Sequence, residues 1–345
     1  MPRHINVPIF IPHLGCPNNC VFCNQRSISG HTAFDPSSVE SEIEEALSTV
    51  SPEDECEIAF FGGSFTGIDR SLMIDLLDRA QKYIDSGRVG SIRLSTRPDY
   101  INDEILTILS RYGVRTVELG LQSLSDRVLT AAGRGHDALC AERACALVKK
   151  YGFELIGQMM IGLPLSDEES EAATARRICQ MGADGARVYP TVVFRDTELA
   201  SMTERGEYTP LTDSEAARRT AKVLDIFDRA GVPCIRVGLC ASENLADESR
   251  VVGGANHPSV GEMAMSELYF TRICQELDRV EAKGGELTVY VARGAVSKAV
   301  GQKRRNKLKL CEKYDLKSVK VLEKNEIIGY NIIIEYCRKN TDEGR

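Results

Sequence analysis

Three cysteines near the start of the chain could hold a metal cluster. Cys16, Cys20 and Cys23 have the spacing C-x3-C-x2-C, and no fourth cysteine lies close to them in the sequence. Iron–sulfur clusters normally take four cysteine thiolates, so this set predicts a [4Fe–4S] cluster with one iron left open for another molecule. The alternatives are a zinc site missing one ligand and three unrelated thiols. Zinc favours paired cysteines or a nearby histidine, and His13 and His31 do not make such a pair.

The cysteine loop follows an apolar run of strand length. Residues 5–11 are mostly apolar and end at Pro12, which predicts a strand that stops just before the cysteines. Residues 57–61 indicate a second, buried strand that runs into Gly62 and Gly63. Adjacent glycines allow a ligand to approach the backbone closely, although a tight turn would also explain them.

Further strands and helices alternate along the first 240 residues. The expected helices cover 36–50, 70–85, 102–112, 137–151 and 167–181, and the expected later strands cover 91–95, 115–120, 153–161 and 185–189. Strands that alternate with helices form a parallel sheet with right-handed crossovers. The six steps are too few for a closed eight-unit barrel, so the predicted fold is α/β, a partial (β/α)6 barrel. Function is expected at the carboxyl ends of such strands, where the cysteines and glycines lie.

Length and composition limit the class of protein. The 345 residues fit a large barrel plus a smaller module, and we expect a core at 1–240, a connector and helix at 241–284, and a small α+β module at 285–345. Hydrophobic residues make up 43% and charged residues 27%, as in ordinary globular proteins. No apolar run approaches the ~20 residues of a membrane span and no signal-peptide core follows Met1, so a cytoplasmic protein is expected.

Several separated segments resemble the radical SAM superfamily in their order and spacing. The similarity is to the radical SAM half of the Elongator catalytic subunit family and, more distantly, to oxygen-independent coproporphyrinogen III oxidase. It covers residues 1 to about 240. Besides the cysteine loop, the matching segments are Gly62-Gly63-Ser64-Phe65, Thr96-Arg97-Pro98-Asp99-Tyr100, Val117-Glu118-Leu119-Gly120-Leu121-Gln122-Ser123, Gly133-Arg134-Gly135-His136, Met159-Met160-Ile161-Gly162-Leu163-Pro164 and Tyr189-Pro190-Thr191-Val192-Val193.

This resemblance implies a cofactor site. Cys16, Cys20 and Cys23 would bind the [4Fe–4S] cluster, whose open iron is chelated in this superfamily by the amino and carboxylate groups of S-adenosylmethionine (SAM). Phe22 corresponds to an aromatic residue placed against the adenine. The segment Gly62-Gly63-Ser64 matches one that hydrogen-bonds the methionine amino group.

Three later side chains complete the SAM contacts that the resemblance implies. Gln122 and Arg134 match a polar pair that the coproporphyrinogen oxidases use on SAM. Arg134 suits the SAM carboxylate because a guanidinium is a planar donor. Gln158 stands where those oxidases carry an aspartate for the ribose hydroxyls.

The resemblance also implies the first steps of an activity. Members of the superfamily accept one electron from a flavodoxin- or ferredoxin-type reductant, cleave SAM to methionine and a 5′-deoxyadenosyl radical, and abstract hydrogen from a bound substrate. The Elongator subunits continue into an acetyltransferase domain, whereas the roughly 100 residues after position 240 contain no convincing acetyl-CoA loop. Their carboxymethylation chemistry is therefore not expected to carry over.

The C-terminal part concentrates positive charge. We expect a helix at 261–282, helical structure at 297–314, and strands at 287–291, 319–322 and 327–336. Between Arg293 and Lys320 there are ten Lys/Arg and two Asp/Glu, an excess of +8 in a chain of net charge −7. Such asymmetry suggests an anionic partner for one face, although a basic helix that balances an acidic barrel is the alternative.

A short motif inside this basic stretch resembles a nucleic-acid-binding loop. Residues 299–306 are similar to the loop and following helix of a KH module, in which G-x-x-G clamps a single-stranded backbone. Arg304 replaces the second glycine and could contact a phosphate directly. Lys303, Arg304 and Arg305 are therefore candidate RNA contacts.

Two function classes remain open. In the first, a radical SAM enzyme acts on RNA, such as a tRNA base, and the basic module presents the substrate. In the second, the enzyme acts on a small molecule or a tetrapyrrole-like metabolite and the module is a structural cap. A cluster that only relays electrons or senses redox state is disfavoured, because the SAM-contact segments would then have no purpose.

Overall fold

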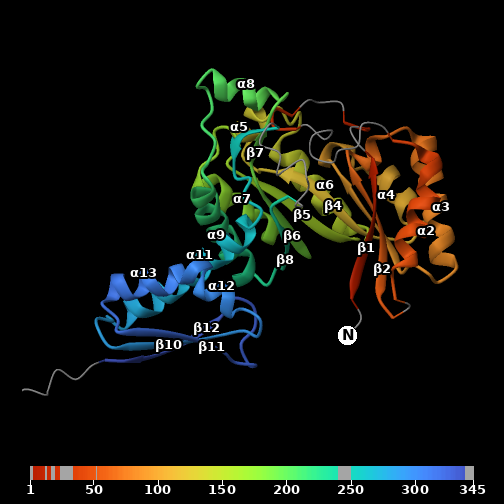
Figure 1. The fold of residues 1–345 in the computed structure, drawn as a ribbon. Helices are drawn as coiled ribbons and strands as arrows, with labels where there is room; N and C mark the ends of the chain where they lie inside the picture. Colours follow the sequence, from red (N-terminus) through yellow and green to blue (C-terminus); the bar gives the residue numbers. More distant parts are fainter. Residues whose placement is uncertain are drawn as a thin grey trace, which may run out of the picture.

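The core of the molecule is one curled sheet of seven parallel strands (Figure 1). The computed structural model describes residues 3–11, 14–16, 20–23, 34–51, 53–239 and 250–338. In spatial order the strands are β1 (His4–Ile11), β2 (Glu55–Gly62), β3 (Ser91–Thr96), β4 (Val114–Gln122), β5 (Glu154–Ile161), β6 (Gly185–Pro190) and β8 (Cys234–Val237). Because neighbours in the sheet follow the order of the chain, the strands form an open half-barrel.

Helices connect successive strands and cover one face of the sheet (Figure 1). They are α2 (Val39–Ser48), α3 (Arg70–Asp85), α4 (Asp103–Leu109), α5 (Asp126–Ala131), α6 (Ala138–Lys150), α7 (Glu168–Gln180) and α9 (Asp213–Arg229), with short 3-10 turns η1 (Pro36–Ser38), η2 (Phe65–Gly67) and η3 (Pro98–Tyr100). Side chains cap several of them. Asp137 accepts from the Cys140 N–H at the start of α6, and Thr212 with Glu215 forms a capping box on α9.

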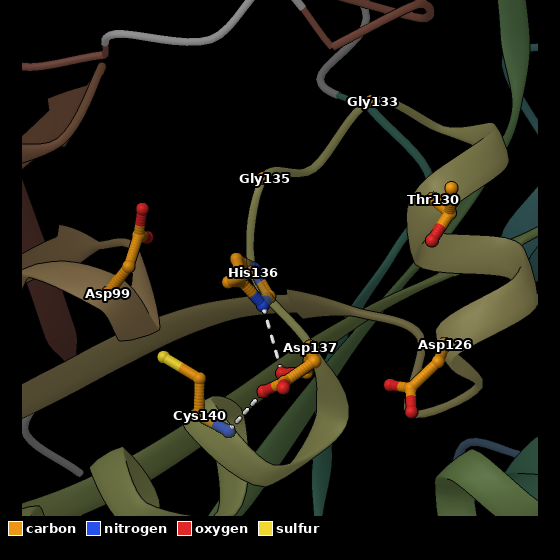
Figure 2. Close-up of a pocket in the computed structure, with 8 residues that line it drawn as sticks. All are labelled: Asp99, Asp126, Thr130, Gly133, Gly135, His136, Asp137 and Cys140. Atoms are coloured by element: carbon orange, nitrogen blue, oxygen red, sulfur yellow. Dashed lines mark hydrogen bonds between the residues drawn. The ribbon is translucent and has the colours of Figure 1, made fainter.

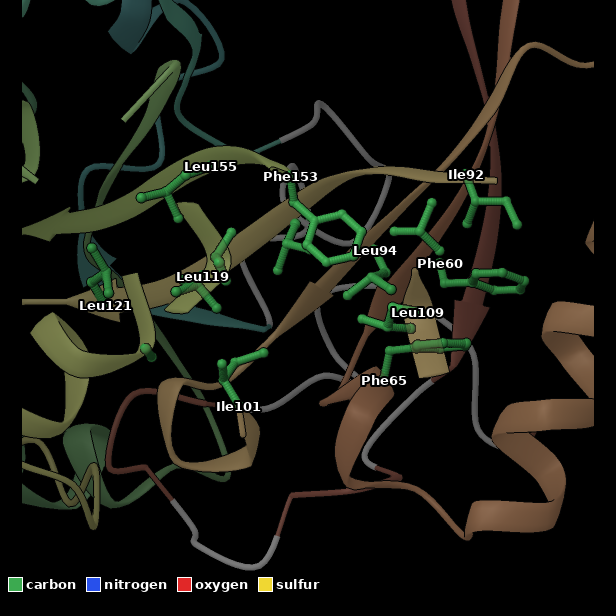
Figure 3. Packing of buried hydrophobic residues seen from close by; sticks show 14 of the residues in the cluster. Phe60, Phe65, Ile92, Leu94, Ile101, Leu109, Leu119, Leu121, Phe153 and Leu155 are labelled. Atoms are coloured by element: carbon green, nitrogen blue, oxygen red, sulfur yellow. The ribbon is translucent and has the colours of Figure 1, made fainter. Parts of the chain in front are cut away.

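The two faces of the sheet differ in polarity. Side chains alternate along each strand, and one set, which includes Ile92, Leu94 and Leu119, packs against the helices (Figure 3). Phe60 of this set stacks on Phe65 with ring centroids 4.5 Å apart. The other set faces the inside of the half-barrel and includes buried charged groups. Three of these, Glu57, Arg93 and Glu118, form a continuous row of ion pairs that ends at the partly buried Arg187.

A smaller mixed sheet follows the half-barrel. It consists of β10 (Glu286–Val291) between the parallel β11 (Ser318–Glu323) and the antiparallel β12 (Ile332–Cys337). Its helical elements are α11 (Val260–Arg279), α12 (Val296–Val300), η4 (Gln302–Arg304) and α13 (Arg305–Tyr314). In Figure 1 these helices lie on the side of the small sheet that faces the half-barrel. Arg272 of α11 joins the two parts, because it donates to Asp225 and Asp228 of α9 at 2.8 Å each.

Three further elements lie at the carboxyl edge of the large sheet. Strand β7 (Val192–Phe194) pairs antiparallel with β9 (Val251–Gly254), and α8 (Glu198–Glu204) follows β7. Among the described residues no helix is long and apolar enough to cross a membrane.

The predicted fold class is confirmed. The sequence analysis did not predict the long helix α9 (Asp213–Arg229), and the other differences concern short elements, which include α5 and α8. Strand β8 and the β7–β9 pair were not predicted, because each has only three or four residues. The helical stretch expected at 297–314 is broken at Gly301, whose φ is 76°. The last strand begins at Ile332 and not at 327. The division at residues 240 and 284 stays a prediction.

Candidate active site

The carboxyl edge of the large sheet brings most of the candidate residues together. The cysteine loop follows β1, Gly62 ends β2, and Gln122 ends β4. Polar groups gathered from several strand ends are the usual form of a barrel active site.

Backbone hydrogen bonds hold the described part of the cysteine loop against later elements. The N–H of Val21 donates to the carbonyl of Ala132 at the end of α5 (3.1 Å), and the carbonyl of Val21 accepts from Leu199 of α8 (2.8 Å). The N–H of Cys23 donates to the carbonyl of Cys20 (2.9 Å), which makes a tight turn. Phe22 lies partly buried among apolar side chains that include Val128 and Leu163 on one side and Leu199 and Tyr208 on the other.

Glycines let the loops after β1 and β2 touch backbone to backbone. A Cβ on Gly63 would lie 2.1 Å from the carbonyl oxygen of Leu14, and one on Gly15 would lie 2.2 Å from that of Ser64. The N–H of Ser64 donates to the Leu14 carbonyl (3.0 Å). Gly15 and Gly63 are thus required for this close approach of the two loops. A tight turn alone does not account for the glycine at position 63.

The Ser64 side chain faces into the protein. It is fully buried, its hydroxyl lies 2.8 Å from Oγ1 of Thr96, and it accepts from the N–H of Arg97 (3.2 Å). A ligand at this segment would therefore meet the backbone of Gly62 and Gly63.

Two arginines lie beside Cys20. Nη1 of Arg134 is 3.3 Å from the sulfur of Cys20, and Nη1 of Arg97 is 3.9 Å from it. Both arginines are almost fully buried, at 5% and 3% exposure, so Arg134 is not a solvated loop residue. Burial raises the pKa of the neighbouring Cys16 thiol, and the two guanidinium groups oppose this rise.

Gln122 has features expected of a ligand-binding residue. Its φ is 64°, the sheet register shifts between Gly120 and Gln122, and the side chain is 5% exposed. Its amide oxygen is buried and has no hydrogen-bond partner within the described part of the chain. A strained backbone with an unsatisfied acceptor is costly and is found at sites that bind something. Gln158 lies on the neighbouring strand, opposite Gly120 in the register, and is partly exposed.

A cavity of about 650 Å³ opens beside the loop that contains Gly133, Gly135 and His136 (Figure 2). Its lining includes the carboxylates of Asp99, Asp126 and Asp137 together with His136. Burial, together with the charge of Arg134, lowers the pKa of His136 to about 4, so this imidazole is neutral at pH 7. Its Nε2 is buried without a partner among the described residues. The cavity therefore offers acidic oxygens and a neutral imidazole.

The residues at this edge fit a cluster with an attached small molecule. The described ranges contain no group of three or more His, Cys, Asp or Glu side chains placed to hold a metal ion. Guanidinium groups beside a thiolate stabilise its charge, and the amide oxygen of Gln122, which has no partner among the described residues, suits a polar ligand.

Two family profiles match most of the chain. The Radical SAM superfamily profile matches residues 10–175, and the Radical_SAM C-terminal domain profile matches residues 183–270. The chain belongs to the radical SAM superfamily. The resemblance found in the motifs is therefore confirmed, and with it the expectation of a [4Fe–4S] cluster and SAM as cofactors.

Relatives of this radical SAM protein include RNA-modifying proteins. The tRNA uridine(34) acetyltransferase of Methanocaldococcus jannaschii is 28% identical over 208 residues, which cover 53% of this chain and 38% of that protein. Elongator complex protein 3 of Schizosaccharomyces pombe is 25% identical over 254 residues, which cover 62% and 47%. The chain thus spans less than half the length of these relatives.

A solved structure supports the same architecture. The Elp3 of Methanocaldococcus infernus with an N-terminal deletion superposes with a TM-score of 0.60 at 20% identity, covering 81% of this chain and 64% of that one. At this identity the likeness shows the fold alone.

Sequence reasoning gave no role to three residues of this site: Arg97, Asp99 and His136. All three lie in segments that match the superfamily, but the approach of Arg97 to the cysteine loop depends on a contact between residues far apart in the chain. Arg97 and Cys20, for example, are separated by 77 positions. The signal that could have found Arg97 is a cation placed directly after the buried strand β3, at the edge where the cysteines lie.

Proposed function

We propose that this radical SAM enzyme abstracts hydrogen from a base in RNA, and that its C-terminal module binds the RNA backbone. In this proposal Cys16, Cys20 and Cys23 hold the cluster. Phe22, Gln122, Gln158 and the Gly62-Gly63-Ser64 backbone contact SAM. When bound, these cofactors supply one-electron cleavage of SAM and hydrogen abstraction. The chain's own residues place the substrate and keep water out. A one-electron reductant is needed, and its identity stays a prediction.

The observation that carries the RNA proposal is the unpaired charge of the C-terminal module. Among the described residues, Lys313 and Lys317 are the two of its ten basic residues between positions 293 and 320 that form an ion pair, with nitrogen–oxygen distances of 3.9 Å to Asp278 and Glu286 respectively. The other eight form no ion pair in the part of the chain that the structure describes. The half-barrel, in contrast, pairs many of its surface arginines, such as Arg88 with Glu44. Unpaired positive charge is the form that attracts nucleic acid.

The loop between α12 and α13, together with the first residue of α13, presents three of these charges. Lys303, Arg304 and Arg305 are exposed, and the first two have φ values of 51° and 62°. Asn306 fixes the loop, because its side-chain amide donates to the carbonyls of Ser266 (2.8 Å) and Ala299 (3.0 Å). The order β10–α12–loop–α13–β11 has two helices joined by a short loop between two strands, which supports the KH-like interpretation.

A salt titration of RNA binding tests the proposal. If the three loop residues neutralise three phosphates, replacing all of them with glutamine removes about 2 from the slope of log K against log[salt] for a single-stranded RNA, at roughly 0.7 per phosphate. The matched control is Lys313→Gln with Lys317→Gln, since these lysines already face carboxylates. It should keep most of the slope.

The small-molecule alternative predicts a different result. If the module is only a cap, the wild-type chain has no salt-dependent RNA affinity to lose, and the triple variant shows lowered stability. In that case RNA would also fail to stimulate 5′-deoxyadenosine formation under anaerobic conditions. Either outcome would remove RNA from the proposed function and leave the radical SAM assignment intact.

A further inference from the structure

Two buried guanidinium groups converge on one sulfur atom. Nη1 of Arg134 lies 3.3 Å from Sγ of Cys20, within hydrogen-bond range for sulfur, and Nη1 of Arg97 lies 3.9 Å from the same atom. Cys20 is itself 7% exposed. A positive charge acts over this distance with little screening, because water is largely excluded.

Several hydrogen bonds fix the orientation of the two arginines. Asp99 binds Arg97 through two parallel bonds, from Nε (2.9 Å) and Nη2 (2.8 Å). Nη2 of Arg97 also donates to the carbonyl of Arg134 (2.5 Å), and Nη2 of Arg134 donates to the carbonyl of Gly120 (2.6 Å). Neither guanidinium can turn away from the sulfur without breaking these bonds.

The two arginines differ in their surroundings. Arg97 forms an ion pair with Asp99 (2.8 Å), whereas Arg134 makes the shorter contact with the sulfur of Cys20. The sulfur of Cys20 therefore lies within reach of N–H donors from two positively charged groups.

We propose that Arg97 and Arg134 are positioning residues that raise the reduction potential of the cluster bound through Cys20. The inference rests on the proposal that Cys20 is a cluster ligand, but it does not depend on the substrate. Hydrogen bonds to ligand sulfurs and nearby positive charge favour the reduced cluster, which carries one more negative charge. In the step concerned, the reductant loses one electron, the cluster gains it, and no bond forms or breaks.

A potentiometric titration of the reconstituted full chain tests this proposal. Dithionite serves as reductant, SAM is absent, and the reduced cluster is followed by electron paramagnetic resonance. Arg134→Gln should lower the ratio of reduced to oxidised cluster at a fixed potential about tenfold, which is 59 mV for a one-electron couple. Arg134→Lys should recover part of this shift because it keeps the charge. Arg143→Gln is the matched control, since Arg143 is an exposed arginine on α6 and its charge is screened by water.

Asp99→Asn provides a variant with the opposite sign. It removes the negative charge beside Arg97 and should raise the potential, whereas a purely structural role would not make the two variants move in opposite directions. This variant decides the matter if Arg134→Gln fails to assemble a cluster. A potential unchanged or lowered in Asp99→Asn, or unchanged in Arg134→Gln with full iron content, would overturn the proposal. Full iron content in Cys20→Ala would instead show that the ligand assignment is wrong.

Discussion

Arg187 on β6 forms an ion pair with Glu118 on β4, with Nη2 of the arginine 2.9 Å from Oε1 of the glutamate. The pair reaches across β5 on the inner face of the half-barrel, and the two side chains are 13% and 2% exposed. The same glutamate oxygen accepts from Arg93 (2.8 Å), which also binds Glu57 (3.0 Å). One carboxylate thus pairs with two guanidinium groups, one of which also pairs with Glu57, where little solvent reaches them.

We expect Glu118→Gln to destabilise the fold strongly. The substitution leaves Arg93 and Arg187 without the carboxylate between them, and breaking a buried pair from one side typically costs about 3–5 kcal/mol. Urea denaturation measures the loss. The control Glu44→Gln breaks the pair between Glu44 and Arg88, whose side chains are 53% and 45% exposed, and should leave the free energy of unfolding almost unchanged because solvent screens this pair. Equal effects of the two variants would mean that the inner face is solvated.

The pH dependence of stability should contain a contribution from His136. Its pKa in the fold is about 4, against an ordinary value of 6.5, mainly because burial disfavours the imidazolium. Between these values the unfolded chain binds the proton more readily, so the stabilising contribution is complete above about pH 6.5 and is lost as the pH falls toward 4.

Histidine NMR checks this prediction directly. Of the five histidines, one should show an imidazole that stays neutral down to about pH 5, and its resonance should be missing from His136→Gln. The same variant should lose less stability than the wild type between pH 7 and pH 5. If every histidine resonance of the folded wild type moves near pH 6.5, the burial of His136 is not as the structure has it.

The sequence predicted the half-barrel because its strands and helices are long and strongly patterned. Strand β8 was missed since its four residues, Cys234–Val237, are too short for a periodic signal. The sequence contains a sign of the ion pairs on the inner face, because Arg93 and Glu118 are charged residues inside otherwise apolar strands. Their pairing could not be derived, since it depends on strand order and register.

The site was predicted by resemblance, and physical reasoning from residue types reached only part of it. The cysteine spacing and the glycine pair can be recognised from residues that are close together in the sequence. In contrast, the positions of Arg97 and Arg134 beside Cys20 follow from contacts between loops that are 77 and 114 residues apart. Resemblance had assigned Arg134 to the SAM carboxylate. That contact stays a prediction. In the structure, Nη1 of Arg134 contacts Sγ of Cys20, and Nη2 of Arg134 donates to the carbonyl of Gly120.

Gln122→Leu should separate SAM binding from stability. The amide oxygen of Gln122 is buried without a partner in the described chain, so its removal should leave the free energy of unfolding unchanged or slightly higher. If this oxygen accepts a hydrogen bond from SAM, the variant should bind SAM more weakly by about 1–3 kcal/mol. Equilibrium dialysis against labelled SAM measures this, with the exposed Gln180→Leu as control. Unchanged SAM affinity with an intact cluster would remove Gln122 from the SAM site.

Gly63→Ala should disturb the cluster site more than the fold. The φ of Gly63 is not positive, so alanine meets no backbone strain, but its Cβ would lie 2.1 Å from the Leu14 carbonyl, whereas real contacts stay above 3.0 Å. The loop that leads to Cys16 must therefore move. Because residues that support metal ligands typically contribute 10–100-fold to metal affinity, we expect reconstituted protein to hold iron about that much more weakly.

The control Gly87→Ala has a φ of 73° and open space around the new Cβ. It should lose roughly 1–2 kcal/mol of stability from the left-handed backbone while keeping its iron. Iron titration and urea denaturation of both variants distinguish the two effects. A Gly63→Ala chain that keeps wild-type iron affinity would show that the contact between the loops after β1 and β2 does not position the cysteines.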